Sequence, residues 1–237
     1  WLEPRHLAQR RVVEDHVRRH APLARDLVPY EPHLLVALLI DAVPGYETRD
    51  RIVATLTLPD DRPDNAELVR RLTREIELGA PGTRAAVSGE VPLSGNVSTA
   101  RVLAIDGRAI EAGPDERPPS LEMNTAMPEY IEVLGVRIVR GRPLDRRDVA
   151  GAEPIVLLNE AGARRFWPDG EDPIGRRLEV EYFGERTTLV VAGIYGDVRT
   201  SGRSTVSRAQ GMVPYPQWTQ RSRVQLVVHV PPARPLA

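Results

Sequence analysis

The residues whose type and spacing best suit chemistry are two histidines near the start of the chain. His16 and His20 are four positions apart, beside the carboxylates Glu14 and Asp15. On a helix this spacing puts both imidazoles on one face, where they could share a metal ion. No third ligand is evident, and a solvated face of arginine and histidine is the more economical interpretation. We therefore expect no metal site.

A second candidate pair is Glu179 and Glu181, two positions apart in an alternating segment. This spacing places both carboxylates on one face of a strand, and a retaining glycosidase holds its two carboxyl groups about 5 Å apart. Alternating charge on the solvent face of a strand is far commoner. The GxSxG, HExxH, P-loop and GxGxxG patterns are all missing from the sequence. The chain is therefore predicted not to be an enzyme.

The composition removes whole classes of chemistry. All 32 basic residues are arginine, because lysine is absent, and cysteine is absent too. Without cysteine there is no thiol nucleophile, disulfide, Cys-ligated zinc or iron–sulfur cluster. Without lysine there is no Walker A loop, Ser–Lys dyad or Schiff base. No cofactor is predicted, and any ATP must be bound by another chain or another part of the parent protein.

Charge and hydropathy narrow the possible partners. The net charge is −1, whereas a nucleic-acid-binding domain normally carries a strong basic excess. Hydrophobic residues make up 41% of the 237 residues, which is enough for one large domain or two small ones with real cores. The longest apolar run, Leu34 to Ile40, is far shorter than the roughly 18–20 residues that span a bilayer.

The first half of the chain has the pattern of a helix followed by a β-α-β unit. Residues 1–27 are predicted to form a polar helix with a narrow apolar stripe. Residues 51–58 alternate like a half-buried strand, and residues 84–90 form a second strand. Between them, the apolar spacing predicts a helix through about Leu78, with Asp64 as its N-cap. The short links favour a parallel strand pair with a right-handed crossover.

The second half of the chain is predicted to consist of strands, turns and short helices. A helical turn is expected at 130–134, ended by Gly135, and a helix at 160–166, before Pro168. Residues 112–120 are expected to form a loop. The predicted strands are 101–105, 136–139, 155–158, 177–182, 187–195 and 224–230, with the fourth and fifth joined as a hairpin.

Several residues have structural roles that the pattern predicts. Asn159 is the expected N-cap of the helix at 160–166, and Phe166 and Trp167 are expected to anchor that helix on the sheet. Asp197 and Arg199 are expected to form a surface ion pair. Glycines are expected at turns and strand ends, where the backbone requires a positive φ or where two backbone segments approach closely. They are Gly135, Gly141, Gly175, Gly193 and Gly196.

From Tyr130 to Tyr215 the chain carries several motifs in a fixed order. They read YIEVLGVRIVRGRPLDRRD, PIVLLNEAGARRFWPDGEDPIGRRLEV, LVVAGIYGDVR and MVPYPQW. Together they resemble the periplasmic core domain of MacB-type ABC permeases, particularly the acidobacterial-type subfamily of predicted permeases. The segment from Gly45 to Gly95 is similar to that family's opening β-α-β unit. The resemblance covers residues 45–230.

The resemblance implies an α+β fold with two subdomains. One is a mixed α/β porter-like subdomain, and the other is a β-rich sabre-like subdomain inserted into it. The predicted segments are an N-terminal helical segment (1–44), the first porter-like part (45–98), the sabre-like subdomain (99–221) and an incomplete return to the porter-like subdomain (222–237).

The resemblance also implies a function. It predicts a non-catalytic domain at the periplasmic, extracytoplasmic face of the inner membrane, in a membrane-embedded permease. There it couples cytoplasmic ATP hydrolysis to substrate export or to signalling. The implied partners are a second permease copy, a separate ATP-binding subunit or domain, and a periplasmic adaptor.

Candidates for partner contact are arginine and aromatic residues expected to be exposed in sabre-like loops: Arg203, Arg208, Tyr215 and Trp218. An alternative function stays open at this point. It is a stand-alone extracytoplasmic module that binds a ligand or peptide, and a closed apolar pocket would favour it.

Overall fold

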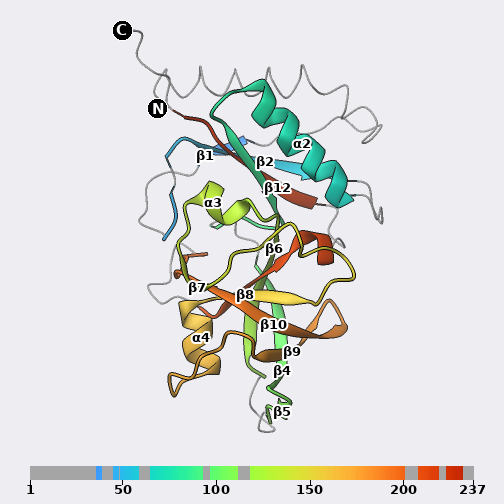
Figure 1. Ribbon diagram of the computed structural model, residues 1–237, viewed down its shortest axis with the longest axis vertical. Helices are drawn as coiled ribbons and strands as arrows, with labels where there is room; N and C mark the ends of the chain where they lie inside the picture. Colours follow the sequence, from blue (N-terminus) through green and yellow to red (C-terminus); the bar gives the residue numbers. More distant parts are fainter. Residues whose placement is uncertain are drawn as a thin grey trace.

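The computed structural model of the chain describes residues 36–38, 45–47, 49–58, 65–92, 97–111, 118–200, 208–218 and 223–231. The predicted helix over 1–27, with His16 and His20, lies outside the described residues, as do Asp64 and Arg203. The fold is mixed α and β, and mostly sheet (Figure 1). In the described part, no helix has the length and apolar character needed to cross a membrane.

One half of the molecule, the sheet half, is an antiparallel sheet covered by a helix (Figure 1). Its strand order is β1-β2-β12-β3. The elements are β1 (Val36–Leu38), β2 (Arg51–Thr57), α2 (Asn65–Gly79), β3 (Arg84–Ser88) and β12 (Arg223–His229). Val69 and Ile76 of α2 are buried in one cluster with Val87, Leu226 and Val228 of the sheet. β1 is a strand within the segment 1–44 that was predicted to be helical.

The helix α2 joins two strands that do not pair with each other. β12 lies between β2 and β3 and is antiparallel to both, so that His229 has Arg51 on one side and Arg84 on the other. The predicted parallel pair is therefore wrong, because a strand from much later in the chain separates its members. A signal for this central position is the apolar run Leu226–Val228, which is buried on both faces.

The position of His229 predicts a dependence of stability on pH. Its pKa is lowered by burial and by the Arg51 guanidinium, against the opposing charge of Asp50; Arg84 is its other cross-strand neighbour. A lowered folded-state pKa means that the stabilising contribution is present above the unfolded value of about 6.5 and is lost as pH falls from there through the folded-state pKa.

We therefore expect the free energy of unfolding to fall between pH 7.5 and pH 5.5. The step is less than about 1 kcal/mol, because solvent screens this partly exposed group. It should be absent from His229→Gln, measured by urea unfolding at each pH. Identical pH profiles for the parent and the variant would contradict this role of His229.

The other half, the barrel half, closes on itself. Its cyclic strand order is β6-β11-β8-β10-β9-β4 and back to β6. The strands are β4 (Ser98–Ile105), β6 (Ser120–Ala126), β8 (Ile155–Asn159), β9 (Arg177–Tyr182), β10 (Glu185–Tyr195) and β11 (Gln210–Pro214). The β6–β11 and β8–β10 pairs are parallel and the other pairs are antiparallel. Closure pairs both sides of each strand and so removes free sheet edges.

Apolar side chains fill the interior of the barrel. Fully buried examples from its six strands are Val102, Leu121, Leu158, Val180, Leu189 and Val213. Helix α4 (Glu160–Phe166) lies against the barrel, and its end contributes Phe166 and Trp167 to the same cluster, as predicted. The short strands β5 (Arg108–Ala109) and β7 (Ile138–Gly141) pair with β4 and β10, respectively.

Most predicted elements of the second half are confirmed, but three strands were missed. The hairpin of β9 and β10, the strand β8 with helix α4, and the helical turn α3 (Tyr130–Leu134) all form. Gly135 ends α3 with φ +66°, as predicted. The missed strands are the two-residue β5, β6, which begins at Ser120 in the predicted loop, and β11.

The two halves share one joint. Ser88 of β3 pairs with Ala126 of β6, so the barrel strand β6 continues into the sheet half. α3 is held there because Glu47 N donates to Leu134 O at 2.8 Å. One buried cluster combines sheet-half residues such as Val53 with barrel residues such as Leu157. In the described part of the chain, the two halves therefore pack together as one continuous structure and are not joined only by a linker.

Candidate functional site

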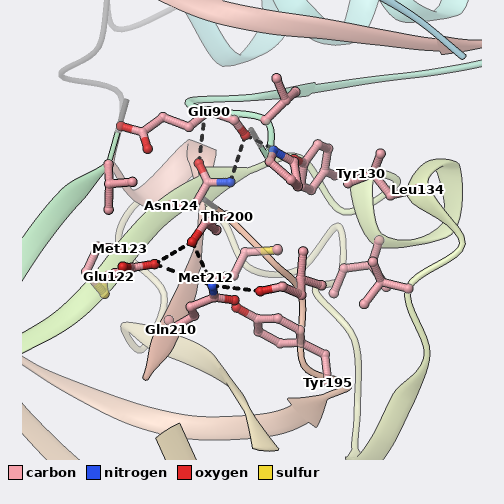
Figure 2. A pocket seen from close by; sticks show the side chains of 17 residues that line it. Glu90, Glu122, Met123, Asn124, Tyr130, Leu134, Tyr195, Thr200, Gln210 and Met212 are labelled. Atoms are coloured by element: carbon pink, nitrogen blue, oxygen red, sulfur yellow. Dashed lines mark hydrogen bonds between the residues drawn. The ribbon is translucent and has the colours of Figure 1, made fainter. Parts of the chain in front are cut away.

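A cavity lies at the joint between the two halves (Figure 2). Its empty volume is about 570 Å³, opening to solvent included. Its walls come from the segment after β3, from β6 and α3, and from the end of β10 through β11. The apolar walls include Val91, Met123, Ile131, Leu134, Val136 and Met212.

One side of the cavity is fixed by Asn124 of β6. Its Oδ1 accepts from Glu90 N at 2.9 Å, and its Nδ2 donates to Ser88 Oγ at 2.8 Å and to Glu90 O at 2.9 Å. The Tyr130 hydroxyl donates to the same carbonyl at 3.0 Å. Burial raises the pKa of Tyr130 far above its usual value, so this donor stays protonated. These bonds tie β6 and α3 to the turn after β3.

The opposite side carries a carboxylate, Glu122, which is only 8% exposed. Thr200 Oγ1 donates to Glu122 Oε2 at 2.8 Å, and Arg208 Nη1 lies 3.3 Å from Oε1. Gln210 Nε2 donates to Val198 O at 2.9 Å and lies 3.4 Å from Glu122 Oε2. Figure 2 shows Glu122 and Tyr195 on either side of Gln210.

Tyr195 brings a free hydroxyl to this side. The residue is 4% exposed and lines the cavity, and within the described residues its hydroxyl makes no hydrogen bond. Burial raises the pKa of Tyr195, and the carboxylates of Glu122 and Asp197 raise it further. The hydroxyl is thus neutral and able to donate or accept one bond to a guest.

Behind the cavity, Asn159 joins four segments. It is fully buried, and its Oδ1 accepts from Gly162 N and from Gln210 N, both at 2.8 Å. Its Nδ2 donates to Asp197 Oδ1 at 2.9 Å and to Arg208 O at 2.8 Å. The predicted N-cap is confirmed, and the residue also positions the strand that carries Gln210.

The predicted pair of Asp197 with Arg199 is wrong. Asp197 accepts from Arg164 Nη2 at 2.8 Å and from Ala161 N at 2.8 Å, so it caps α4 together with Asn159. The reason is that the chain after β10 runs beside the start of α4, and the free N–H groups of that helix end attract a carboxylate.

The four candidate contact residues are not equivalent. Arg208 is exposed, with 67% of its side chain accessible, and Arg203 lies outside the described residues. The expected exposure of the two aromatic residues is wrong, because Tyr215 is 0% and Trp218 9% exposed. Tyr215 begins a 3-10 helix, η2 (Tyr215–Gln217), and packs under α2. Trp218 packs in the barrel cluster, 5.3 Å from the Tyr182 ring.

Glu179 and Glu181, the carboxylate pair considered for catalysis, lie on β9, where Glu181 has a structural role. Glu181 forms ion pairs with Arg101 of β4 and Arg186 of β10, so it links three neighbouring strands. Among the residues that the structure describes, no three His, Asp or Glu side chains come close enough to hold a metal ion. The cavity residues Glu122 and Tyr195 were not singled out by the sequence, because one lies on a missed strand and the other ends an apolar one.

The order of the motifs along this fold agrees with a known family. The model of the MacB-like periplasmic core domain matches residues 44–236. The chain therefore belongs to the family of MacB-like periplasmic core domains. It is the extracytoplasmic domain of an FtsX- or MacB-type ABC transporter permease, located at the outer face of the inner membrane.

The solved structures with a fold similar to that of the chain include two extracytoplasmic domains of transporters. The periplasmic region of MacB from Actinobacillus actinomycetemcomitans is 14% identical, with a TM-score of 0.48 over 80% of this chain and 78% of that one. The extracellular domain of the ABC-type transporter YknZ from Gram-positive bacteria is 13% identical, with a TM-score of 0.45 over 76% of this chain and 83% of that one. A search of curated proteins finds no match.

Proposed function

We propose that the domain catalyses no reaction and couples ATP hydrolysis, by a separate cytoplasmic subunit or domain, to export of a substrate or to signalling outside the membrane. The observation that carries this proposal is the position of the two strands β2 and β12. Arg51, at the start of β2, pairs with His229, at the end of β12, and Val230 N donates to Asp50 O at 2.8 Å. The start of β2 and the end of β12 thus lie side by side, at one point of the sheet half.

Force applied at that point reaches the rest of the domain without a flexible link. Membrane segments of the parent permease that move the β2–β12 pair would also move β3, and the joint at Ser88 and Ala126 passes the motion to the barrel. The β5 tip lies at the far end of the barrel (Figure 1). When the domain moves as a rigid body, partner proteins on its surface exchange one set of contacts for another.

The partners on this proposal are a second permease copy, an ATP-binding subunit and a periplasmic adaptor, with Arg208 as the exposed contact candidate. The division into a porter-like part (45–98 and 222–237) and a sabre-like part (99–221) is supported by the return of β12 to the first sheet. Within it, α3 packs on β3 and β12 of the porter-like part, although its residues lie in the sabre-like range. Membership of the acidobacterial-type subfamily stays a prediction.

An insertion tests the coupling. Placing Gly-Gly-Ser after Pro231 lengthens the exit beside β12, and we expect the full permease complex to keep its ATP hydrolysis while export or signalling falls to background. The matched control places the same insertion after Gly184, in the β9–β10 turn, where a Cβ atom added to the glycine would have no other atom within 4 Å. Export that survives both insertions would contradict the proposal.

A ligand-binding function is the second candidate, and the cavity is the observation that favours it. A ligand there would contact both halves of the domain, so binding and coupling are compatible rather than exclusive functions.

A further inference from the structure

We propose that residues 45–47 form a releasable strap, which lies across the joint and links the segment leading into β2 to the barrel half. Two contacts hold the strap closed, and one buried polar group inside it opposes closure. Its use in the permease rests on the proposed coupling function, whereas its opening is a property of the domain alone.

The first anchor of the strap joins Gly45 to the barrel half. Gly45 has φ +80°, and a Cβ atom on it would collide with Asp197 O and lie 3.4 Å from Val198 Cα. Only glycine meets both the positive φ and the close backbone contact. The side chain of Asp197 accepts from Ala161 N at 2.8 Å, and Val198 O accepts from Gln210 Nε2 at 2.9 Å. The strap therefore rests on the segment that positions the start of α4 and Gln210.

The second anchor joins Glu47 to the end of α3. Glu47 N donates to Leu134 O at 2.8 Å, which is the one backbone hydrogen bond of the strap among the described residues. A Cβ atom on Gly135 would lie 3.3 Å from Glu47 Cβ. Because α3 packs on β3 and β12, this anchor belongs to the sheet half. A displacement of the strap therefore acts on both halves.

Between the anchors, Tyr46 makes opposing contributions to closure. Its side chain is 7% exposed and lies in one cluster with Tyr130, Tyr195 and Val198, which favours the closed strap. Its hydroxyl is buried and has no hydrogen-bond partner among the described residues. This hydroxyl regains bonds to water when the strap opens, which favours release. A segment with so few hydrogen bonds opens locally while the rest of the domain stays folded.

Amide hydrogen exchange, followed by NMR in the protein of residues 1–237, measures the opening. The Glu47 N–H reports on the anchor at α3, and the Ala161 N–H reports on the α4 start that Asp197 caps. Val227, fully buried in the central strand β12, is the internal reference. We expect the Glu47 N–H to exchange at least about 100-fold faster than the Val227 N–H.

Two substitutions should change the opening in opposite directions. Gly45→Ala is expected to speed exchange about tenfold at both Glu47 and Ala161, because its methyl group displaces the strap from Asp197. The matched control is Gly107→Ala, which has a similar φ of +78° but no other atom within 4 Å of the added Cβ, and both reporters should keep their parent rates. Tyr46→Phe removes the unpaired hydroxyl and should slow exchange about fivefold at both reporters.

A disulfide tests the link between the strap and α4 within a single protein. The chain has no cysteine, so Glu47→Cys with Gly135→Cys forms the only possible pair. The Cβ separation of 3.3 Å is close to the usual range of about 3.5–4.5 Å. Oxidation should slow exchange of the Ala161 N–H several-fold, and reduction should restore it.

Four results would each overturn the strap. They are equal exchange at Glu47 and Val227, equal effects of Gly45→Ala and Gly107→Ala, faster exchange in Tyr46→Phe, and an Ala161 rate that ignores the redox state of the disulfide. A failure of the coupling function is measured separately, by the insertion after Pro231 in the full permease complex, so the two failures are distinguishable.

Discussion

Replacing Asn159 with alanine is expected to lower the free energy of unfolding by about 3–5 kcal/mol. The buried side chain accepts from Gly162 N and Gln210 N, each at 2.8 Å, and both donors lose their acceptor in the variant. Each unsatisfied buried group costs about 1–3 kcal/mol, and the lost cap on α4 adds to this. Urea unfolding followed by circular dichroism measures the loss.

Two further variants separate the contributions of Asn159. Asn159→Ser keeps a capping oxygen for Gly162 N but cannot reach Gln210 N as well, so we expect it to recover only part of the loss. Asn159→Asp keeps both acceptors but places a carboxylate where Nδ2 met Asp197 Oδ1 at 2.9 Å. Its stability should therefore improve on mild acidification. A loss below about 1 kcal/mol for the alanine variant would show that Asn159 is not a structural centre.

Replacing Gly193 with alanine is expected to destabilise the domain by about 3 kcal/mol, at the upper end for an overpacked site. A Cβ atom at Gly193 would collide with the backbone carbonyl of Arg142. That carbonyl cannot retreat, because Arg142 N donates to Ala192 O at 3.0 Å and the guanidinium holds buried Asp148 through bonds of 2.8 and 2.7 Å.

Gly196 provides the matched control for Gly193, three positions further along the same motif. A Cβ atom there would lie 3.7 Å from Arg137 O, which is ordinary van der Waals contact, and its φ is not positive. Gly196→Ala is therefore expected to change stability by no more than about 0.5 kcal/mol. Equal effects of the two substitutions in thermal unfolding would contradict the role assigned to close approach at Gly193.

Local patterns predicted the elements whose signals lie within a few residues. The alternation over 177–195 and the apolar run 155–158 with its capped helix both became the expected structures. β6 was missed because its sequence, SLEMNTA, carries Glu122 and Asn124 at positions that look exposed. Their positions depend on hydrogen bonds with distant residues: Asn124 donates to Ser88 and Thr200 donates to Glu122, contacts that no local pattern contains.

For the candidate site, too, the residues whose positions depend on distant contacts were not predicted. Tyr215 and Trp218 were expected to be exposed in sabre-like loops, yet both are buried. A usable signal was the scarcity of aromatic residues, only 5% of the chain, since such large apolar side chains are the ones a core needs most. The cavity could not be predicted, because it exists only where β6, α3 and β11 meet.

The place of β12 also has a consequence for how the chain folds during synthesis. The barrel strands lie between Ser98 and Pro214, whereas the sheet half needs Arg223–His229 as its central strand. The barrel strands have therefore all left the ribosome before the sheet can close, since synthesis runs from the N-terminal end at about 5–20 residues per second. During that interval one edge of β2 and one edge of β3 lack their partner β12. A nascent chain stalled before Val224 should therefore recruit chaperones, and one stalled well beyond Val230 should not.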